Sequence, residues 1–429
     1  MGSLMAHHHT RSVYDRLTDR LNRFPQGAPP SEHLFRILSI LFSEREAALV
    51  AALPIKPFGV AKAAAIWKVG EGEATRVLDE LSSRALLLDL ETPEGRRFVL
   101  PPPMAGFFEF SLMRTRTDLD QKALAEFFYQ YLNVEEDFVR ALFAEGTTQV
   151  GRAFVSEPAL SSGNALHVLD FERASEVILT ASHLGISRCY CRHKMEHVGR
   201  ACAAPQDICM TFNASAESLV KHGHARRVDV PEALDLLAQA RDLGLVQFGE
   251  NVRESVNFIC NCCGCCCEAM IAARRFAAAH PIHTTAFLPA VDAAACTGCE
   301  RCVRACPVEA LAAVSANDPR QPRRTVARLE VDRCLGCGVC VRTCRPGALT
   351  LEPRPARTLT PLNGAHRAVL MAIERGTLQH LLFDNRTLWS HRAMAAFLGA
   401  VLRLPPAQRL LATEQVRSRY LETLIRRFA

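Results

Sequence analysis

Apolar side chains recur at helical spacing through the first hundred residues, and Gly, Pro and Ser divide them into short segments. Ser31 and Ser43 stand where a helix N-cap is expected, each just before a periodic apolar run. The helices predicted from this pattern are 31–42, 43–52, 60–67 and 73–84.

A change to strand-like patterning follows these helices. Residues 85–90 and 96–100 are predicted strands, and the turn Thr92–Gly95 between them predicts a hairpin. Helices followed by two strands resemble a winged helix. The resemblance assigns residues 31–103 to a winged-helix-like domain, preceded by a tail over residues 1–30.

A winged helix often binds DNA through its recognition helix. Here the expected recognition helix sets Glu73, Asp79 and Glu80 against Arg76 and Arg84. Such a surface is poorly suited to phosphates, so nucleic acid is not the expected partner and protein docking is favoured.

The segments beyond this domain are also expected to be mainly helical. Residues 104–180 form a helical linker domain whose aromatic residues are expected to pack in a core, with a helix over 118–142. Residues 356–429 form a helical region with breaks near Gly376 and at Pro405-Pro406. Its last helix, 416–428, is basic and amphipathic, and it is expected either to pack on its own domain or to contact a membrane surface or partner.

The composition indicates how large a core the chain can bury and in which redox compartment it is expected. A 429-residue chain that is 49% hydrophobic can bury several cores. No apolar stretch approaches the ~20 residues of a membrane span, and no signal peptide is expected. Eighteen cysteines without a signal favour metal ligation in a reducing cytoplasm over disulfides, and anaerobic physiology is expected.

Eight of these cysteines form two copies of the spacing C-x2-C-x2-C-x3-C. They are Cys296, Cys299, Cys302 and Cys306 in the first copy, and Cys334, Cys337, Cys340 and Cys344 in the second. This run is typical of [4Fe-4S] clusters, in which a tight loop places three thiolates around one face of the cubane. Zinc is the alternative for paired cysteines, but two complete cubane spacings in tandem favour iron and sulfide.

Residues 290–353 resemble the two-[4Fe-4S] bacterial ferredoxins, apart from Arg345 between Cys344 and Pro346. The resemblance implies two [4Fe-4S] clusters with exchanged fourth ligands, because in paired motifs the last cysteine binds the other cluster. One set is Cys296, Cys299, Cys302 and Cys344, and the other is Cys334, Cys337, Cys340 and Cys306. A ferredoxin-like ββαα module over residues 290–355 is expected.

Ten further cysteines precede this module. Cys189, Cys191, Cys202 and Cys209 form C-x-C-x10-C-x6-C, and Cys260, Cys262, Cys263, Cys265, Cys266 and Cys267 crowd into one eight-residue run. So dense a run indicates metal rather than packing, and its side chains must face at least two directions. One or two further iron-sulfur clusters are predicted: eight thiolates would complete two cubanes, whereas ten would allow a larger or non-cubane cluster.

Other side chains near these cysteines are candidates for supporting roles. His193 and His197 are four residues apart, as ligands or proton carriers on one helix face would be, although surface histidines are the simpler interpretation. Arg188, Arg192 and Lys194 add positive charge that would offset a cluster's negative charge. A cysteine-rich helical cluster domain is expected over residues 181–289.

The predicted fold class is α+β and predominantly helical, with a winged-helix-like domain, a cysteine-rich helical domain, a ferredoxin-like module and a C-terminal helical segment. The order of these parts resembles multi-cluster ferredoxin-family proteins of anaerobic bacteria, which implies electron transfer as a subunit or an iron-sulfur reductase. No catalytic residues are identified. The alternative is a redox-sensing regulator that acts through the winged helix.

The charge balance suggests a partner for such a protein. The net charge of +6 gives no case for nucleic acid, but residues 290–354 hold ten arginines, no lysine and seven acidic residues. This surface is expected either to be merely solvated or to attract an acidic redox protein, such as a ferredoxin or flavodoxin.

Overall fold

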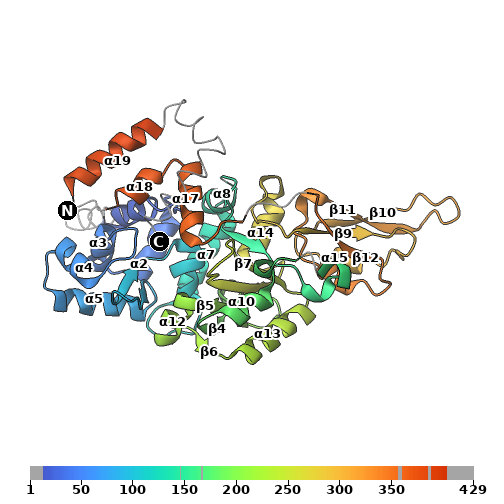
Figure 1. Ribbon diagram of the computed structural model, residues 1–429, viewed down its shortest axis with the longest axis horizontal. Helices are drawn as coiled ribbons and strands as arrows, with labels where there is room; N and C mark the ends of the chain where they lie inside the picture. The colour runs from blue at the N-terminus through green and yellow to red at the C-terminus, as the bar shows by residue number, and fades with distance from the viewer. Residues whose placement is uncertain (1–12, 145, 166–167, 356–359, 385–387, 403–429) are drawn as a thin grey trace. The chain divides into compact units, whose positions relative to one another are not determined.

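The protein was analysed as a computed structural model that describes residues 13–144, 146–165, 168–355, 360–384 and 388–402. The chain forms two compact units. The first takes the chain up to Thr148, residues 217–225 and the part from Asn363 onward, and the second takes residues 149–216 and 226–362. Helices and sheets are both present (Figure 1), which confirms the mixed α and β class.

The first unit begins with the helices that the sequence predicts. They are α2 (Glu32–Leu41), α3 (Glu44–Ala52), α4 (Val60–Trp67) and α5 (Glu71–Ser83). The Ser31 hydroxyl accepts a hydrogen bond from the Leu34 backbone N–H, and Ser43 forms a capping box with Glu46. The predicted N-caps are therefore confirmed.

The predicted hairpin is also present, as β1 (Leu88–Leu90) paired antiparallel with β2 (Arg97–Val99). Two acidic side chains of α5 form ion pairs: Glu73 with Arg45 at 2.7 Å, and Asp79 with Arg96 at 2.5 Å. The secondary structure agrees with a winged helix, but membership in that class stays a prediction.

The aromatic residues after the hairpin pack as the core of the first unit. Phe107, Phe108, Phe128 and Phe138 are fully buried, and their rings contact one another or Tyr131. The elements here are η1 (Pro103–Phe107), α6 (Phe108–Leu112), α7 (Gln121–Tyr129), η2 (Gln130–Val134) and α8 (Asp137–Phe143). The single helix predicted over 118–142 is therefore wrong in detail, because a π-helical turn and an extended residue, Glu135, interrupt it.

The C-terminal part adds α17 (Gly364–Glu374), α18 (Leu378–Leu382) and α19 (Trp389–Leu402). Gly376, with φ +65°, separates the first two, so the break predicted there is confirmed. The helix predicted over 416–428 lies outside the described residues. No helix in the described part of the chain has the length and apolar character to cross a bilayer.

The second unit is built on an antiparallel six-stranded sheet of order β3-β7-β8-β5-β4-β6. The strands are β3 (Gly151–Ala153), β4 (Leu184–Arg188), β5 (Asp207–Phe212), β6 (Arg226–Arg227), β7 (Val246–Glu250) and β8 (Phe258–Cys262). The prediction of a helical cysteine-rich domain missed this sheet. Its strands are short and carry Ser, Asn and Cys among their apolar residues, so the period-2 signal is weak.

Along the chain, helices lie between the strands of the sheet and after its last strand; Figure 1 labels α10, α13 and α14 among them. They are η3 (Glu157–Ala159), α9 (Ser162–Ala165), η4 (Asp170–Glu172), α10 (Ala174–Thr180), α11 (Tyr190–His197), α13 (Val230–Asp242), α14 (Glu268–Arg275) and η5 (Ala277–Ala279). Another helix, α12 (Asn213–Lys221), begins in this unit, and its residues from 217 onward belong to the first unit. The apolar core joins α10 and α13 to strand residues Ile186, Met210 and Ile259. Because strand side chains alternate, Cys209 and Cys260 belong to the other face.

The ferredoxin-type module completes the second unit. β9 (Phe287–Val291) pairs antiparallel with β12 (Leu349–Pro353), and β10 (Leu311–Ser315) pairs with β11 (Thr325–Leu329). Between them lie α15 (Arg301–Ala305), η6 (Val331–Arg333) and α16 (Val339–Thr343). The predicted ββαα module therefore has four strands in two pairs, rather than two strands, together with two short α-helices.

Candidate metal centres

The eight cysteines of the ferredoxin-type module line two separate hollows. The first hollow is lined by Cys296, Cys299, Cys302 and Cys344. The second is lined by Cys306, Cys334, Cys337 and Cys340. Each hollow therefore gathers three cysteines from one motif and the last cysteine of the other motif.

Short helices account for this exchange. Cys302 lies on α15 and Cys306 is its C-cap residue, whereas Cys340 lies on α16 and Cys344 is its C-cap residue. The last cysteine of each motif is thus a helical turn beyond the third, at the end of a helix whose partner lies alongside. That separation carries it to the neighbouring hollow.

Glycines make the cysteine loops tight enough to fit. Gly298 and Gly336 have φ of +68° and +71°, which L side chains rarely adopt. A Cβ at Gly336 would lie 2.1 Å from the Phe287 carbonyl oxygen, and one at Gly298 would lie 2.5 Å from that of Thr325. These two loops therefore require glycine.

Backbone N–H groups and burial set the electrostatics of the hollows. The Ala310 and Gly336 N–H groups donate to the sulfurs of Cys306 and Cys334 at 3.2 and 3.4 Å, as donors around a negative cluster do. Burial raises the pKa of Cys334 to about 11 and that of Cys337 to about 12. These thiols must therefore lose protons when a metal binds.

Six of the ten upstream cysteines form a closed ring of thiols, named here the six-cysteine ring. The Cys262 and Cys267 sulfurs are 3.1 Å apart, and each of the six thiols shifts the pKa of the next. In order around the ring the members are Cys189, Cys191, Cys267, Cys262, Cys260 and Cys209.

The sheet and two helix starts build this ring. Cys260 and Cys262 are two residues apart on β8, so they share one face, and the pairing of Met210 with Ile259 sets Cys209 of β5 beside Cys260. Cys189 is the N-cap residue of α11, and Cys267 is the N-cap residue of α14. Four separate elements therefore meet at the ring.

Negative charge is shared around the ring. Hydrogen bonds with Cys209 and Cys262 lower the pKa of Cys260 to about 5, and those with Cys191 and Cys262 lower the pKa of Cys267 to about 5. The same contacts raise the pKa of Cys191, Cys209 and Cys262 well above the usual range. Thiols of lowered and raised pKa thus alternate around the ring.

Arg192 is the buried cation beside the ring. Its guanidinium donates to the carbonyl oxygens of Pro205 and Asn261, both at 2.6 Å. Burial alone would lower the pKa of Arg192, but the negative charge of nearby cysteines, Cys189 foremost, raises it above its ordinary value. The side chain is therefore fixed and charged where a metal-thiolate centre would need compensation.

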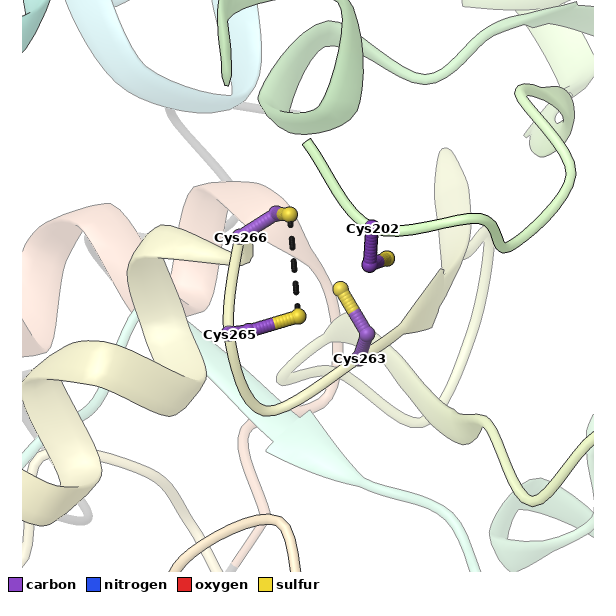
Figure 2. A group of neighbouring side chains, drawn as sticks. All are labelled: Cys202, Cys263, Cys265 and Cys266. Atoms are coloured by element: carbon purple, nitrogen blue, oxygen red, sulfur yellow. Dashed lines mark hydrogen bonds between the residues drawn. The ribbon is translucent and has the colours of Figure 1, made fainter. Parts of the chain in front are cut away.

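The other four cysteines form a second group, named here the four-cysteine site. The sulfurs of Cys202, Cys263, Cys265 and Cys266 all lie within 4.8 Å of one another. Figure 2 shows three of them on one loop, with Cys202 facing them from a separate segment. The Cys265 and Cys266 sulfurs are 3.7 Å apart. Cys265 is exposed and Cys266 is buried, so the site lies at the surface.

The remaining candidate side chains play different parts. His193 is buried, and its Nε2 lies 3.2 Å from that of His197. Lys194, expected to compensate cluster charge, is fully buried in an ion pair with Glu268 of α14. Arg188 pairs with Glu196 at 2.9 Å instead. Glu268 could not be predicted as the partner of Lys194 from local pattern, because 74 positions separate the two residues.

The cysteine run touches the ferredoxin-type module directly. A Cβ at Gly264 would lie 2.8 Å from the carbonyl oxygen of Pro307, the residue that follows Cys306. A second contact to the module comes from α13, whose last residue Asp242 forms an ion pair with Arg342 at 2.6 Å. The four-cysteine site is therefore one backbone contact away from a cysteine of the second hollow.

Comparison with known proteins identifies one part of the chain. Residues 295–348 match the family described as 4Fe-4S dicluster domain. No curated protein and no solved structure matches the chain. The match begins after the ten upstream cysteines, so the assignment concerns the module alone. Residues 295–348 form a ferredoxin-type 4Fe-4S dicluster module.

Proposed function

We propose that the protein transfers electrons between two [4Fe-4S] clusters of the ferredoxin-type module and an additional iron-sulfur centre held by upstream cysteines. The first cluster is bound by Cys296, Cys299, Cys302 and Cys344, and the second by Cys334, Cys337, Cys340 and Cys306. These sets are the ones that line the two hollows. Each cluster would supply one-electron redox chemistry when bound.

The contact of Gly264 with Pro307 is the observation that supports this function. It joins the loop Cys263–Cys267 to the residue after Cys306 without an intervening side chain. Cys267 at the end of that loop is a member of the six-cysteine ring. A continuous chain of packed backbone thus runs from a ligand of the second cluster to the ring.

An acidic redox protein is the proposed external partner. Arg304, Arg320, Arg323, Arg328 and Arg345 of the module are exposed. Positive side chains near a cluster raise the encounter rate with an acidic protein and make it dependent on ionic strength. A ferredoxin or flavodoxin has this chemistry, and the protein then acts as an electron-transfer subunit or a reductase in the cytoplasm.

The Gly264→Ala variant tests the electron path. The added methyl group meets Pro307 and forces the loop away from the module, so electron exchange between module and upstream centre should slow several-fold. Gly163→Ala is the matched control, because a Cβ there meets nothing within 4 Å. The readout is rapid-mixing reduction followed by freeze-quenched electron paramagnetic resonance.

Iron and sulfide contents should be the same in both variants and the parent protein. Equal exchange rates in all three proteins would contradict the proposed path. A parent protein whose module is reduced without any upstream signal changing would contradict the proposed function itself.

A further inference from the structure

We propose that the upstream cysteines hold two different centres: a single tetrahedral metal ion, zinc or iron, at the four-cysteine site, and one polynuclear iron-sulfur cluster at the six-cysteine ring. The ring cluster rests on the proposed function, whereas the single-ion site stands apart from it. Together the two centres use all ten upstream cysteines.

The spacing of the sulfurs carries the single-ion assignment. Metal–sulfur bonds of about 2.3 Å in a tetrahedron place the sulfurs about 3.8 Å apart. In a cubane each thiolate binds a different iron, which spreads the sulfurs to roughly 6 Å. All four sulfurs of the four-cysteine site lie within 4.8 Å of one another, and the Cys265 and Cys266 sulfurs are 3.7 Å apart. The site therefore has the size of one ion.

The length of the loop agrees with this size. Three ligands of the four-cysteine site come from four consecutive positions, Cys263 to Cys266. In the module of the same chain, three cubane ligands are spread over seven positions, Cys296 to Cys302. The shorter loop closes around an ion, and it has no room to reach three iron corners.

The ring has the opposite character. Among the residues that the structure describes, the close-packed set of possible metal ligands is the four-cysteine site, and the six ring thiols do not form such a set. They follow one another in a circle supplied by β5, β8 and the starts of α11 and α14. Neighbouring ring thiols such as Cys262 and Cys267, 3.1 Å apart, are close enough to share one iron. Six thiolates exceed the four that one tetrahedral ion takes, so the ring suits several irons bridged by sulfide.

The chain itself separates the two centres. Along the run, Cys260 and Cys262 belong to the ring, the next three cysteines belong to the four-cysteine site, and Cys267 returns to the ring. Arg192 is near both groups: its guanidinium donates to the carbonyl oxygen of Asn261, between Cys260 and Cys262, and its charge acts on Cys189 of the ring and on Cys263 of the four-cysteine site. One buried cation thus compensates both groups of thiolates.

The test measures zinc, iron and acid-labile sulfide per chain in anaerobically purified full-length protein, and in its Cys202→Ser and Cys260→Ser variants. Cys202→Ser should lose one metal ion per chain, with sulfide unchanged. Cys260→Ser should lose several irons together with sulfide and keep the single ion. Loss of about four irons and their sulfide from Cys202→Ser would overturn the single-ion site, because it would mark a cubane there.

X-ray absorption on the unmodified protein tests the single-ion site without a substitution, so its result does not depend on whether a variant folds. Cells grown with cobalt in place of zinc load a single-ion thiolate site with Co²⁺. Four sulfur neighbours at about 2.3 Å and no metal neighbour around that ion are expected. A metal neighbour in its scattering, or no bound ion after growth with zinc, iron or cobalt, would overturn the proposal. Neither readout depends on electron transfer, so the single-ion site can fail while the proposed function stands.

Discussion

The ferredoxin-type module and the upstream cysteine region gather thiols in different ways. In the module, two loops of one repeated motif supply every cysteine, and the local core itself includes Cys302, Cys340 and Cys344. In the upstream region, a six-stranded sheet has an apolar core free of cysteine, and Cys209, Cys260 and Cys262 lie on its other face. The core of the module thus includes cysteines of its cluster motifs, whereas the upstream region has a separate apolar core without cysteine, called here the upstream frame.

This difference explains what the sequence could predict. The eight-cysteine motif has fixed spacing within one segment, so local pattern was enough to group its members. The six ring cysteines come from strands and helix starts up to 78 positions apart, from Cys189 to Cys267. Their division depends on strand register, such as Met210 beside Ile259, which no local pattern encodes.

The helices of the first unit were predictable for the same reason. The caps at Ser31 and Ser43 and the break at Gly376 are local signals that act within a few residues. The sheet of the second unit was missed because its strands show weak alternation. Burial of His193 and pairing of Lys194 with Glu268 follow from that missed sheet and its covering helices.

Removal of all metal should produce the largest difference between the module and the upstream region. The module should lose its protection against amide hydrogen exchange, since its small core depends on the cluster ligands. Strands β4, β5 and β8 should keep theirs, because their apolar core contains no ligand. Hydrogen exchange with mass spectrometry, before and after anaerobic chelation, makes the comparison. Equal loss of protection in both regions would show that the upstream frame also depends on metal.

Exchange of the fourth ligands inside the module is the next largest effect. Cys306→Ala should remove about four irons, those of the cluster held by Cys334, Cys337 and Cys340. Adding Cys337→Ala should then cost no more iron, whereas adding Cys299→Ala should double the loss. Iron and sulfide analysis of the two double variants decides the matter. The reverse pattern would mean that each motif binds its own cluster.

Breaking the buried ion pair between Lys194 and Glu268 should lower the free energy of unfolding. Lys194→Met removes the cation that is paired with buried Glu268, which costs about 3–5 kcal/mol. The double variant Lys194→Met with Glu268→Leu should recover most of that loss. Chemical denaturation under anaerobic conditions, monitored by circular dichroism, measures both. A single variant as stable as the parent protein would show that the pair does not support the frame.

The smallest expected effect is on redox potential. Arg192→Gln removes the buried charge beside the ring, so the reduced, more negative state becomes less stable and the potential of the upstream centre should fall. Arg188→Gln is the control, since Arg188 is paired with Glu196. Redox titration followed by electron paramagnetic resonance measures both variants. A shift in the control alone, or an unchanged potential in Arg192→Gln, would remove Arg192 as the compensating charge.

Iron and acid-labile sulfide per chain, measured on anaerobically purified protein, test the central claim most directly. The module accounts for about eight irons in two cubanes. The proposed arrangement predicts clearly more iron and sulfide than this, and Cys260→Ser should remove the excess. A parent protein with about eight irons and sulfides, unchanged by that substitution, would contradict an upstream iron-sulfur centre.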